Sequence, residues 1–146
     1  MIEIKGNLWD HEDADIICIT TNGTVKKNGR AVMGKGCALE AKEKYKDIDK
    51  VLGNLITQIG NQAFVVLGTF HRPRIVSFPT KHNWWEKSDL QLIEMSCQLL
   101  LDYVNEKDFK KIVLPRPGCG NGLLKWEVVK SILEKYFDDR FYIVSK

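Results

Sequence analysis

The chain has 146 residues, of which 44% are hydrophobic, and this length and composition suit one globular domain, residues 1–146, with its own core. A formal net charge of +3 and an isoelectric point near 8.6 favour an anionic ligand but exclude the strongly basic surface of a dedicated nucleic-acid-binding protein. No apolar run is long enough to span a membrane and no export signal is evident, so we expect an intracellular, cytoplasmic protein without a membrane partner.

Four cysteines and three histidines are scattered along the chain; the cysteines are Cys18, Cys37, Cys97 and Cys119. No two of them have the C-x-x-C spacing that is typical of zinc and redox sites. The sequence therefore predicts reduced thiols, no disulfide framework, no metal site and no cofactor.

The first predicted elements are two strands. Residues Ile2–Lys5 alternate in polarity, and Gly6-Asn7-Leu8-Trp9 turns the chain before the unbroken apolar run Ile16–Ile19. Because this run is apolar on both faces, it predicts a central strand in a sheet that is covered on both sides.

A glycine loop, Met33–Cys37, follows the polar segment Gly23–Arg30 and opens a helix that reaches Lys42. A helix start presents unpaired N–H groups and the positive end of the dipole, and glycine lets the backbone approach a ligand closely. The loop predicts a phosphate site, with a purely structural turn as the alternative. The basic residues of the polar segment could contact a phosphate backbone or simply be solvated.

The middle of the chain contains a helix and two strands, predicted over Ile48–Ile59, Ala63–Leu67 and Arg74–Phe78. The second strand leads into the loop Pro79–Trp85, which contains two consecutive tryptophans. These tryptophans could stack on a base, form a lid over a ligand or anchor the following helix.

A long helix follows, because Ser88 and Gln91 form the pattern of a capping box before an apolar stripe. Ile112–Leu114 is the next strand. It leads through Gly118–Gly122 to a helix whose apolar spacing continues to Phe137. This second glycine loop matches neither the dinucleotide fingerprint nor the P-loop. Two glycine loops at two helix starts nevertheless favour a ligand with a diphosphate.

The last predicted strand is Phe141–Val144. The alternation of strands and helices, without internal repeats or linkers, predicts an α/β fold. We expect three layers around a mostly parallel sheet.

In combination these motifs resemble the macrodomains, a family that binds ADP-ribose. The resemblance runs from about Ile4 to Val144 and rests on Gly6-Asn7-Leu8, Thr21-Asn22, Met33-Gly34-Lys35-Gly36-Cys37-Ala38-Leu39, Phe78-Pro79-Thr80-Lys81 and the segment from Pro115 to Trp126. The sequence is most similar to the branch that contains the terminal ADP-ribose protein glycohydrolase and the bacterial antitoxins that remove ADP-ribose from DNA. The resemblance implies a three-layer α/β/α sandwich with a mixed sheet.

The resemblance also implies which residues contact ADP-ribose. Asn7 and Leu8 would lie beside the adenine, Asn22 near the distal ribose and Thr80 against the ligand. The two glycine loops would hold the ribose and the diphosphate through Gly34, Lys35, Gly36, Cys37, Ala38, Gly118, Cys119, Gly120, Asn121, Gly122 and Leu123. Lys81 occupies the position of the catalytic lysine of that branch.

Cleavage at the anomeric carbon of ADP-ribose builds positive charge on the ribose, which water or a protein nucleophile can attack. An amine attacks only in its neutral form, so Lys81 would need desolvation or nearby positive charge, for example from Arg116. The alternative to this catalytic role is that Lys81 is a solvated surface residue. Cys37 and Cys119 could also be nucleophiles, but without a recognisable histidine partner they are better explained by packing in the loops.

Two departures from the branch keep alternatives open. Gly122 stands where the protein glycohydrolase has an aspartate, and Gly23–Arg30 is longer than in the relatives. The DNA-directed antitoxins share Gly-Cys-Gly-Asn-Gly, which favours their chemistry. We expect a hydrolase that removes ADP-ribose from a modified macromolecule, either DNA or protein. The alternatives are an ADP-ribose 1''-phosphate phosphatase and a non-catalytic reader of ADP-ribose.

Overall fold

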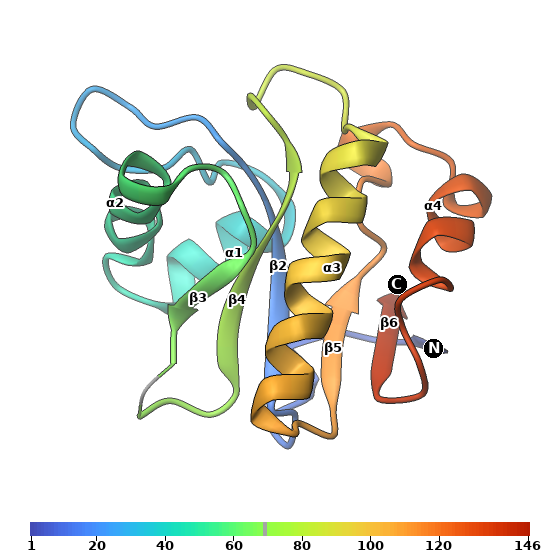
Figure 1. Ribbon diagram of the computed structural model, residues 1–146. Helices are drawn as coiled ribbons and strands as arrows, with labels where there is room; N and C mark the ends of the chain where they lie inside the picture. Colours follow the sequence, from blue (N-terminus) through green and yellow to red (C-terminus); the bar gives the residue numbers. More distant parts are fainter. Residues whose placement is uncertain (69) are drawn as a thin grey trace.

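The computed structural model describes residues 1–68 and 70–146. Within these residues six strands form one sheet in the order β1-β6-β5-β2-β4-β3 (Figure 1). The strands are β1 (Ile2–Lys5), β2 (Ile16–Asn22), β3 (Phe64–Leu67), β4 (Arg74–Lys81), β5 (Ile112–Pro115) and β6 (Phe141–Ser145). All neighbouring strands run parallel except β3 and β4, so the predicted mixed, mostly parallel sheet is confirmed.

Helices cover both faces of the sheet (Figure 1). They are α1 (Gly36–Lys44), α2 (Ile48–Ile59), α3 (Leu90–Lys107) and α4 (Trp126–Leu133), with two short 3-10 turns, η1 (Leu8–Asp10) and η2 (Gly120–Gly122). Helices α3 and α4 pack on one face, while α1 and α2 pack on the other. The expected three-layer α/β/α sandwich is confirmed.

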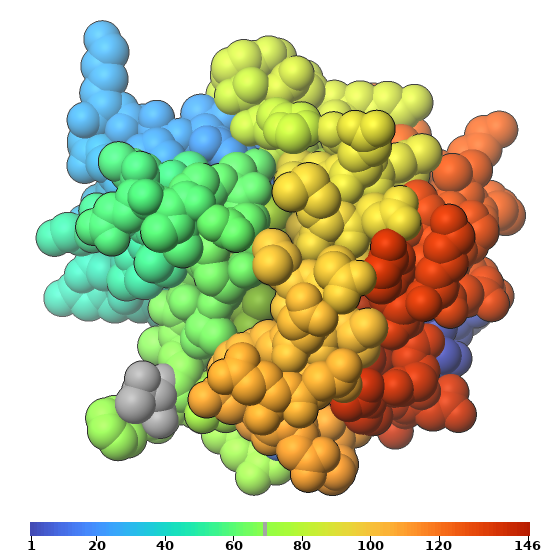
Figure 2. Space-filling view, in the orientation of Figure 1, coloured from blue at the N-terminus to red at the C-terminus, as the bar shows by residue number. Residues whose placement is uncertain are grey.

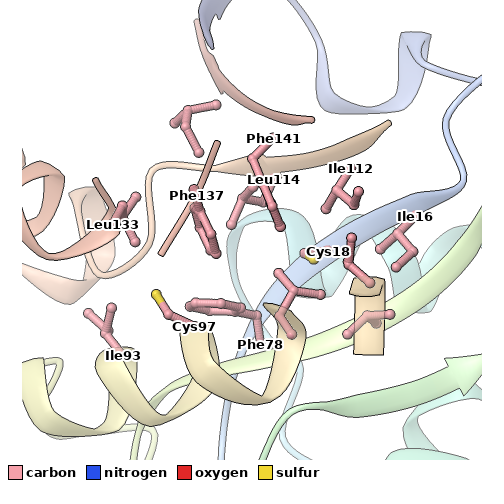
Figure 3. Packing of buried hydrophobic residues seen from close by; sticks show 14 of the residues in the cluster. Ile16, Cys18, Phe78, Ile93, Cys97, Ile112, Leu114, Leu133, Phe137 and Phe141 are labelled. Carbon is pink, nitrogen blue, oxygen red and sulfur yellow. The ribbon is translucent and has the colours of Figure 1, made fainter. Parts of the chain in front are cut away.

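The central strand β2 explains why two cores form. Ile16 and Cys18 belong to the cluster beneath α3 and α4 (Figure 3), whereas Ile17 and Ile19 belong to the cluster beneath α1 and α2. All four side chains are at most 2% exposed, and burial of a large apolar side chain contributes roughly 1.5–3 kcal/mol. The unbroken apolar run Ile16–Ile19 therefore contributes buried side chains to the cores on both faces of the sheet.

The start of α3 differs from the prediction. Asp89 is the N-cap, because its Oδ1 accepts a hydrogen bond from the backbone N–H of Gln91 at 2.9 Å. The predicted cap at Ser88 is wrong. Ser88 is instead buried, and its backbone N–H donates to the carbonyl of Gly122 at 3.1 Å.

The second glycine loop does not lead directly into α4, as the sequence had indicated. It forms η2, after which Leu123 takes a left-handed conformation with φ of 67°, and α4 begins at Trp126. The helix also ends at Leu133, before Phe137. That ring is nevertheless buried, because it stacks on Phe141 with centroids 4.2 Å apart.

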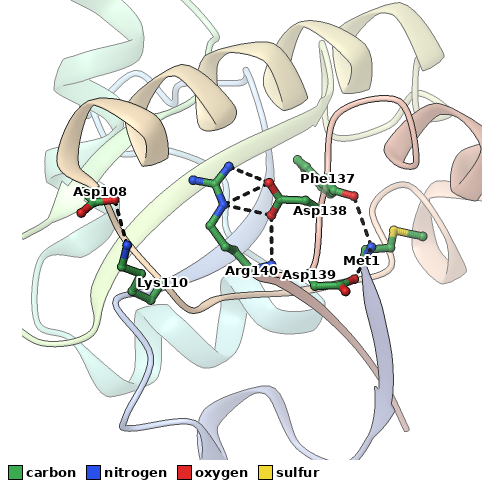
Figure 4. Close-up of polar contacts among 7 residues, drawn as sticks. All are labelled: Met1, Asp108, Lys110, Phe137, Asp138, Asp139 and Arg140. Carbon is green, nitrogen blue, oxygen red and sulfur yellow. Dashed lines mark hydrogen bonds and ion pairs between the residues drawn. The ribbon is translucent and has the colours of Figure 1, made fainter.

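Ion pairs lie in the turns that precede β5 and β6. Arg140 Nη2 lies 2.8 Å from a carboxylate oxygen of Asp138, and Lys110 Nζ lies 2.9 Å from Asp108 (Figure 4). These turns lie at the amino ends of the two strands. Because β1, β2, β4, β5 and β6 are parallel, their carboxyl ends all meet at the opposite edge of the sheet. Across the described residues, no helix has both the length and the hydrophobicity that a membrane crossing requires.

Candidate functional site

A cleft of about 1000 Å³ opens at the edge where the parallel strands end. This volume is at the upper end of the range of about 300–1,000 Å³ for small-molecule sites. Of the residues predicted to contact the ligand or act on it, those that line the cleft are Asn7, Leu8, Asn22, Gly34, Lys35, Gly36, Cys37, Ala38, Thr80, Lys81, Gly118, Cys119, Gly120, Asn121 and Gly122. Leu123 does not line it, and its side chain is 71% exposed.

The first glycine loop opens directly into α1. Lys35 is the N-cap residue but provides no side-chain cap, and the first turn contains no acidic residue. Gly36 has φ of 58°, a conformation that favours glycine. The first N–H groups of α1 therefore have no partner within the helix and no competing carboxylate, which suits an anion.

The second glycine loop is held by packing against the start of α3. A Cβ atom at Gly118 would lie 2.8 Å from Ile93 Cδ1, and one at Gly122 would collide with Ser88 Oγ. Gly120 differs from both: it has φ of 67°, and no other atom lies within 4 Å of its Cβ position. The loop thus presents Gly120 at its open tip, while its two ends are fixed.

The two glycine loops approach each other across the cleft. Asn121 Nδ2 of the second loop lies 3.5 Å from the position that a Cβ would take at Gly36 of the first. Both loops line the same cleft. The pairing of two sequence-distant glycine loops, which the sequence only suggested, is therefore a feature of the structure.

Lys81 ends β4 beside Asn22, its partner in β2. Its ammonium group donates to the carbonyl of Trp84 at 3.4 Å, and its own carbonyl accepts from Asn61 Nδ2 at 3.0 Å. Gly23 N–H donates to the carbonyl of His82 at 3.1 Å. A Cβ at Gly23 would lie only 2.7 Å from Asn61 Nδ2, so close packing positions the backbone around Lys81.

Asn61 and Gly23 were not identified from the sequence. Both act through contacts between segments that are far apart in the chain, and neither residue lies in a recognisable motif. Sequence spacing carries no signal for such contacts.

The charges of the cleft are mostly positive. Its basic lining residues are Lys35, Lys81, Arg116 and Lys146. Among the described residues that line the cleft, Glu40 has the one carboxylate side chain, and Glu40 Oε1 accepts from Trp9 Nε1 at 3.2 Å. This balance favours an anionic ligand.

Arg116 is less free than the other cations. Its Nη2 lies 3.6 Å from Glu3 Oε1, and its guanidinium lies 4.7 Å from the ring centroid of Trp126. Glu3 also pairs with Lys130 at 2.7 Å. The positive charge of Arg116, which we expected to act near Lys81, is therefore partly compensated by Glu3.

The two cysteines of the cleft are poor nucleophiles. Burial raises the pKa of the Cys37 thiol, whose sulfur lies 3.3 Å from both the backbone nitrogen and the hydroxyl of Thr20. Burial also raises the pKa of Cys119. Both thiols therefore stay protonated at neutral pH, in agreement with a packing role. Within residues 1–68 and 70–146, no group of three His, Cys, Asp or Glu side chains could hold a metal ion.

Two asparagines shape the walls of the cleft. Asn7 Oδ1 accepts from the N–H of Trp9 at 3.0 Å and so caps η1. Asn22 Nδ2 donates to the carbonyl of Val32 at 3.0 Å, while its Oδ1 accepts from Thr24 N–H at 2.9 Å. The Asn22 side chain thus holds the segment that leads to the first glycine loop.

The tryptophan pair lies at the surface rather than in the core. Trp84 lines the cleft and is 51% exposed, whereas Trp85 is 63% exposed and lies outside the lining. The suggested role as a hydrophobic anchor is therefore wrong. In the polar segment Gly23–Arg30, the guanidinium of Arg30 pairs with Asp47 at 3.1 Å and with the buried Asp49 at 2.8 Å, so it is not a free cation.

Comparisons with known proteins agree on one family. A family model for the Macro domain matches residues 20–133. The DNA ADP-ribosyl glycohydrolase of Thermus aquaticus is 34% identical over 137 residues, which are 90% of this chain and 36% of that protein. The DNA ADP-ribosyl glycohydrolase of Mycobacterium tuberculosis is 33% identical over 111 residues, covering 73% of this chain and 32% of its own length. The chain therefore spans about a third of these relatives.

A solved structure extends the likeness to the whole fold. The macrodomain of Mycobacterium tuberculosis DarG has a TM-score of 0.84 and 28% sequence identity to this chain. The match covers 99% of this chain and 97% of that one. The likeness thus includes both glycine loops and every strand that ends at the cleft.

Proposed function

Because this chain belongs to the Macro domain family, we propose that it binds ADP-ribose in the cleft and removes ADP-ribose from modified DNA. One observation carries the proposal: both glycine loops and Lys81 line a single cleft at the carboxyl ends of the parallel strands. The curated relatives that carry the name DNA ADP-ribosyl glycohydrolase support DNA as the modified macromolecule.

The diphosphate would lie between the two glycine loops. The uncapped start of α1 offers N–H groups on one side, and the open tip at Gly120 leaves room on the other. Lys35 adds positive charge at the first loop. The adenine end would then lie against Asn7 and Leu8, and the distal ribose would lie toward Asn22 and Lys81.

Lys81 would carry the chemistry. Its neutral amine would form a bond to the anomeric carbon while the bond from that carbon to the modified DNA breaks, and the DNA would take up the proton that the amine nitrogen loses. Water would then hydrolyse the lysyl adduct and release ADP-ribose. The protonated thiols of Cys37 and Cys119 are unsuited to the same role, and Glu40 is engaged by Trp9.

The aspartate of the protein glycohydrolase has no counterpart in this mechanism. A side chain at Gly122 would collide with Ser88 Oγ, so the second loop has no space for an acid at that position. This packing favours a mechanism that depends on an amine over one that needs a carboxylate in the loop.

Substitution of Lys81 by alanine separates binding from turnover. We expect Lys81→Ala to keep its affinity for ADP-ribose within about tenfold, or about 1.4 kcal/mol, because the glycine loops hold the diphosphate. Turnover should be lost, since a group that acts mainly in the transition state affects rate more than binding. Calorimetry measures the first effect, and release of ADP-ribose from an ADP-ribosylated oligonucleotide measures the second.

The matched control is Lys42→Ala, which removes an exposed lysine outside the cleft and should change neither quantity. ADP-ribosylated protein and ADP-ribose 1''-phosphate, tested side by side, distinguish the substrate classes. Undiminished hydrolysis by Lys81→Ala would disprove the lysine mechanism. Tight binding by the wild type without turnover of any substrate would instead identify a reader.

A further inference from the structure

Two surface segments beside the cleft are joined into one unit: the hairpin of residues 23–31 and the loop of residues 82–88. Trp84 N–H donates to Thr24 Oγ1 at 3.1 Å, and Thr24 Oγ1 lies 3.3 Å from Asn83 Oδ1. The hairpin is closed by the antiparallel bridge between Val25 and Ala31. In Figure 1 both segments project from the same end of the sheet, where β2 and β4 end at the cleft.

The loop presents the two exposed tryptophans. Their rings pack edge to face, with centroids 5.8 Å apart and an angle of 87° between the planes. Trp84 forms part of the cleft wall, while Trp85 lies outside the wall and is 63% exposed. The pair therefore makes a continuous aromatic path from the cleft to the outer surface.

The same unit carries cations without partners. Lys26 and Lys27 at the hairpin tip and Lys87 in the loop are exposed, and among the described residues none of the three forms an ion pair. Arg30 differs, because Asp47 and Asp49 neutralise it. Figure 2 shows the hairpin and the loop along one border of the molecule.

Glu86 of the loop and Asp89, which follows the loop, both have side-chain partners. Glu86 Oε1 accepts from Asn83 Nδ2 at 2.7 Å, and Asp89 Oδ2 lies 2.6 Å from His82 Nε2. The unpaired charge of the joined segments is thus mainly positive, next to exposed aromatic rings.

We propose that this unit, which we term the hairpin platform, binds the single-stranded DNA that flanks the modified nucleotide. Exposed aromatic rings bind single strands by stacking on unpaired bases, and lysines bind the phosphates. A duplex hides its base faces, so the tryptophans favour a single strand. The inference rests on the proposed function: the modified nucleotide enters the cleft toward Lys81, its neighbour stacks on Trp85, and the backbone runs past Lys26 and Lys27.

The test uses an unmodified single-stranded oligonucleotide with a fluorescent label, and the full chain in the variant Trp85→Ala, Lys26→Gln, Lys27→Gln. We expect anisotropy titrations to show at least about a tenfold loss of DNA affinity. The salt dependence of log K should become shallower by about 1.4, since each phosphate contact on a single strand contributes a slope of about 0.7. Affinity for free ADP-ribose, measured by calorimetry, should stay unchanged because none of the three residues lines the cleft.

The matched control is Phe70→Ala, Lys46→Gln, Lys107→Gln. It removes one exposed aromatic ring and two exposed lysines outside the cleft and the platform, so its net charge is identical to that of the test variant. We expect this control to bind the oligonucleotide as the wild type does. A platform variant that binds DNA no more weakly than this control would overturn the inference, and so would a wild type that binds no single strand.

Further outcomes separate the inference from the function on which it rests. Equal losses of turnover by the platform variant on ADP-ribosylated DNA and on an ADP-ribosylated peptide would also overturn the DNA platform. Platform-dependent DNA binding in a chain that binds no ADP-ribose would disprove the proposed function while retaining the platform.

Discussion

The two glycine loops have similar composition but different construction. The first opens α1 without a side-chain cap, and no other atom lies within 4 Å of the Cβ position of Gly34. The second is packed at both ends: Gly118 lies against Ile93, and Gly122 lies against Ser88. The first loop thus leaves helix N–H groups available, whereas the second is closely packed at both ends and open at Gly120.

This difference shows that a glycine in a binding loop can serve two separate purposes. At Gly120 the absence of a side chain leaves space toward the cleft. At Gly122 it lets the loop contact the start of α3. Substitutions at the two positions should therefore affect different quantities, ligand binding in one case and folding in the other.

The largest expected effect is on binding, at the open position. We expect Gly120→Glu to weaken ADP-ribose binding by at least about a hundredfold, or about 2.7 kcal/mol, because it brings a bulky negative charge to the proposed diphosphate site. The control Gly120→Ala has the same backbone strain at φ of 67° without the charge. Calorimetry measures the ADP-ribose affinity of both variants, once each has been shown to be folded. Retained binding by Gly120→Glu would place the diphosphate elsewhere.

The second effect is on stability, at the packed position. We expect Gly122→Ala to lower the free energy of unfolding by about 2 kcal/mol, because its methyl group would overlap Ser88. Ser88→Gly in the same chain should recover part of this loss, and urea denaturation measures the coupling between the two sites. If the losses from the two single variants simply add, the proposed steric conflict is absent.

The smallest expected effect is on stability, at the cap of helix α3, which helix α1 lacks. We expect Asp89→Ala to lower stability by about 1 kcal/mol at pH 7 through loss of the α3 cap. The hydrogen bond from His82 is the main cause that lowers the pKa of Asp89 below the ordinary 3.8. The stabilisation that depends on the carboxylate is therefore present above pH 3.8 and is lost as the pH falls further.

Urea denaturation between pH 7 and pH 2.5 measures this dependence. The gap between wild type and Asp89→Ala should narrow at the acidic end. Asp89→Asn can still cap the helix, so it should lose mainly the pH-dependent part of the free energy of unfolding that Asp89 contributes. A gap that is constant with pH would exclude a contribution from the charge.

The sequence predicted the strands and the layer order because hydrophobic periodicity reports burial directly. Ile16–Ile19 is apolar on both faces, and it lies at the centre of the sheet. The start of α3 was harder to predict, since Ser88 and Asp89 both have side chains that cap helices. Only the long-range contact of Ser88 with Gly122 decides between them.

The candidate site was predicted mainly through family resemblance, which assigned Lys81 and both glycine loops to one ligand. The amino-acid sequence did not show that Leu123 would take a left-handed conformation and lie outside the lining of the cleft. It also gave no sign of Asn61, which reaches Lys81 from the turn after α2. Such contacts join residues that are distant in the chain, and local patterns do not encode them.

The place of β6 in the sheet has a consequence for how the cleft is completed during synthesis. β6 lies between β1 and β5, and β1 pairs with β6. A chain grows from its amino end, so β1 must wait for residues 141–145 before it can join the sheet. Both glycine loops and Lys81 will have left the ribosome earlier. The strand that leads to the wall of Asn7 and Leu8 therefore joins the sheet only after β6 has formed, although these two residues are made before both glycine loops.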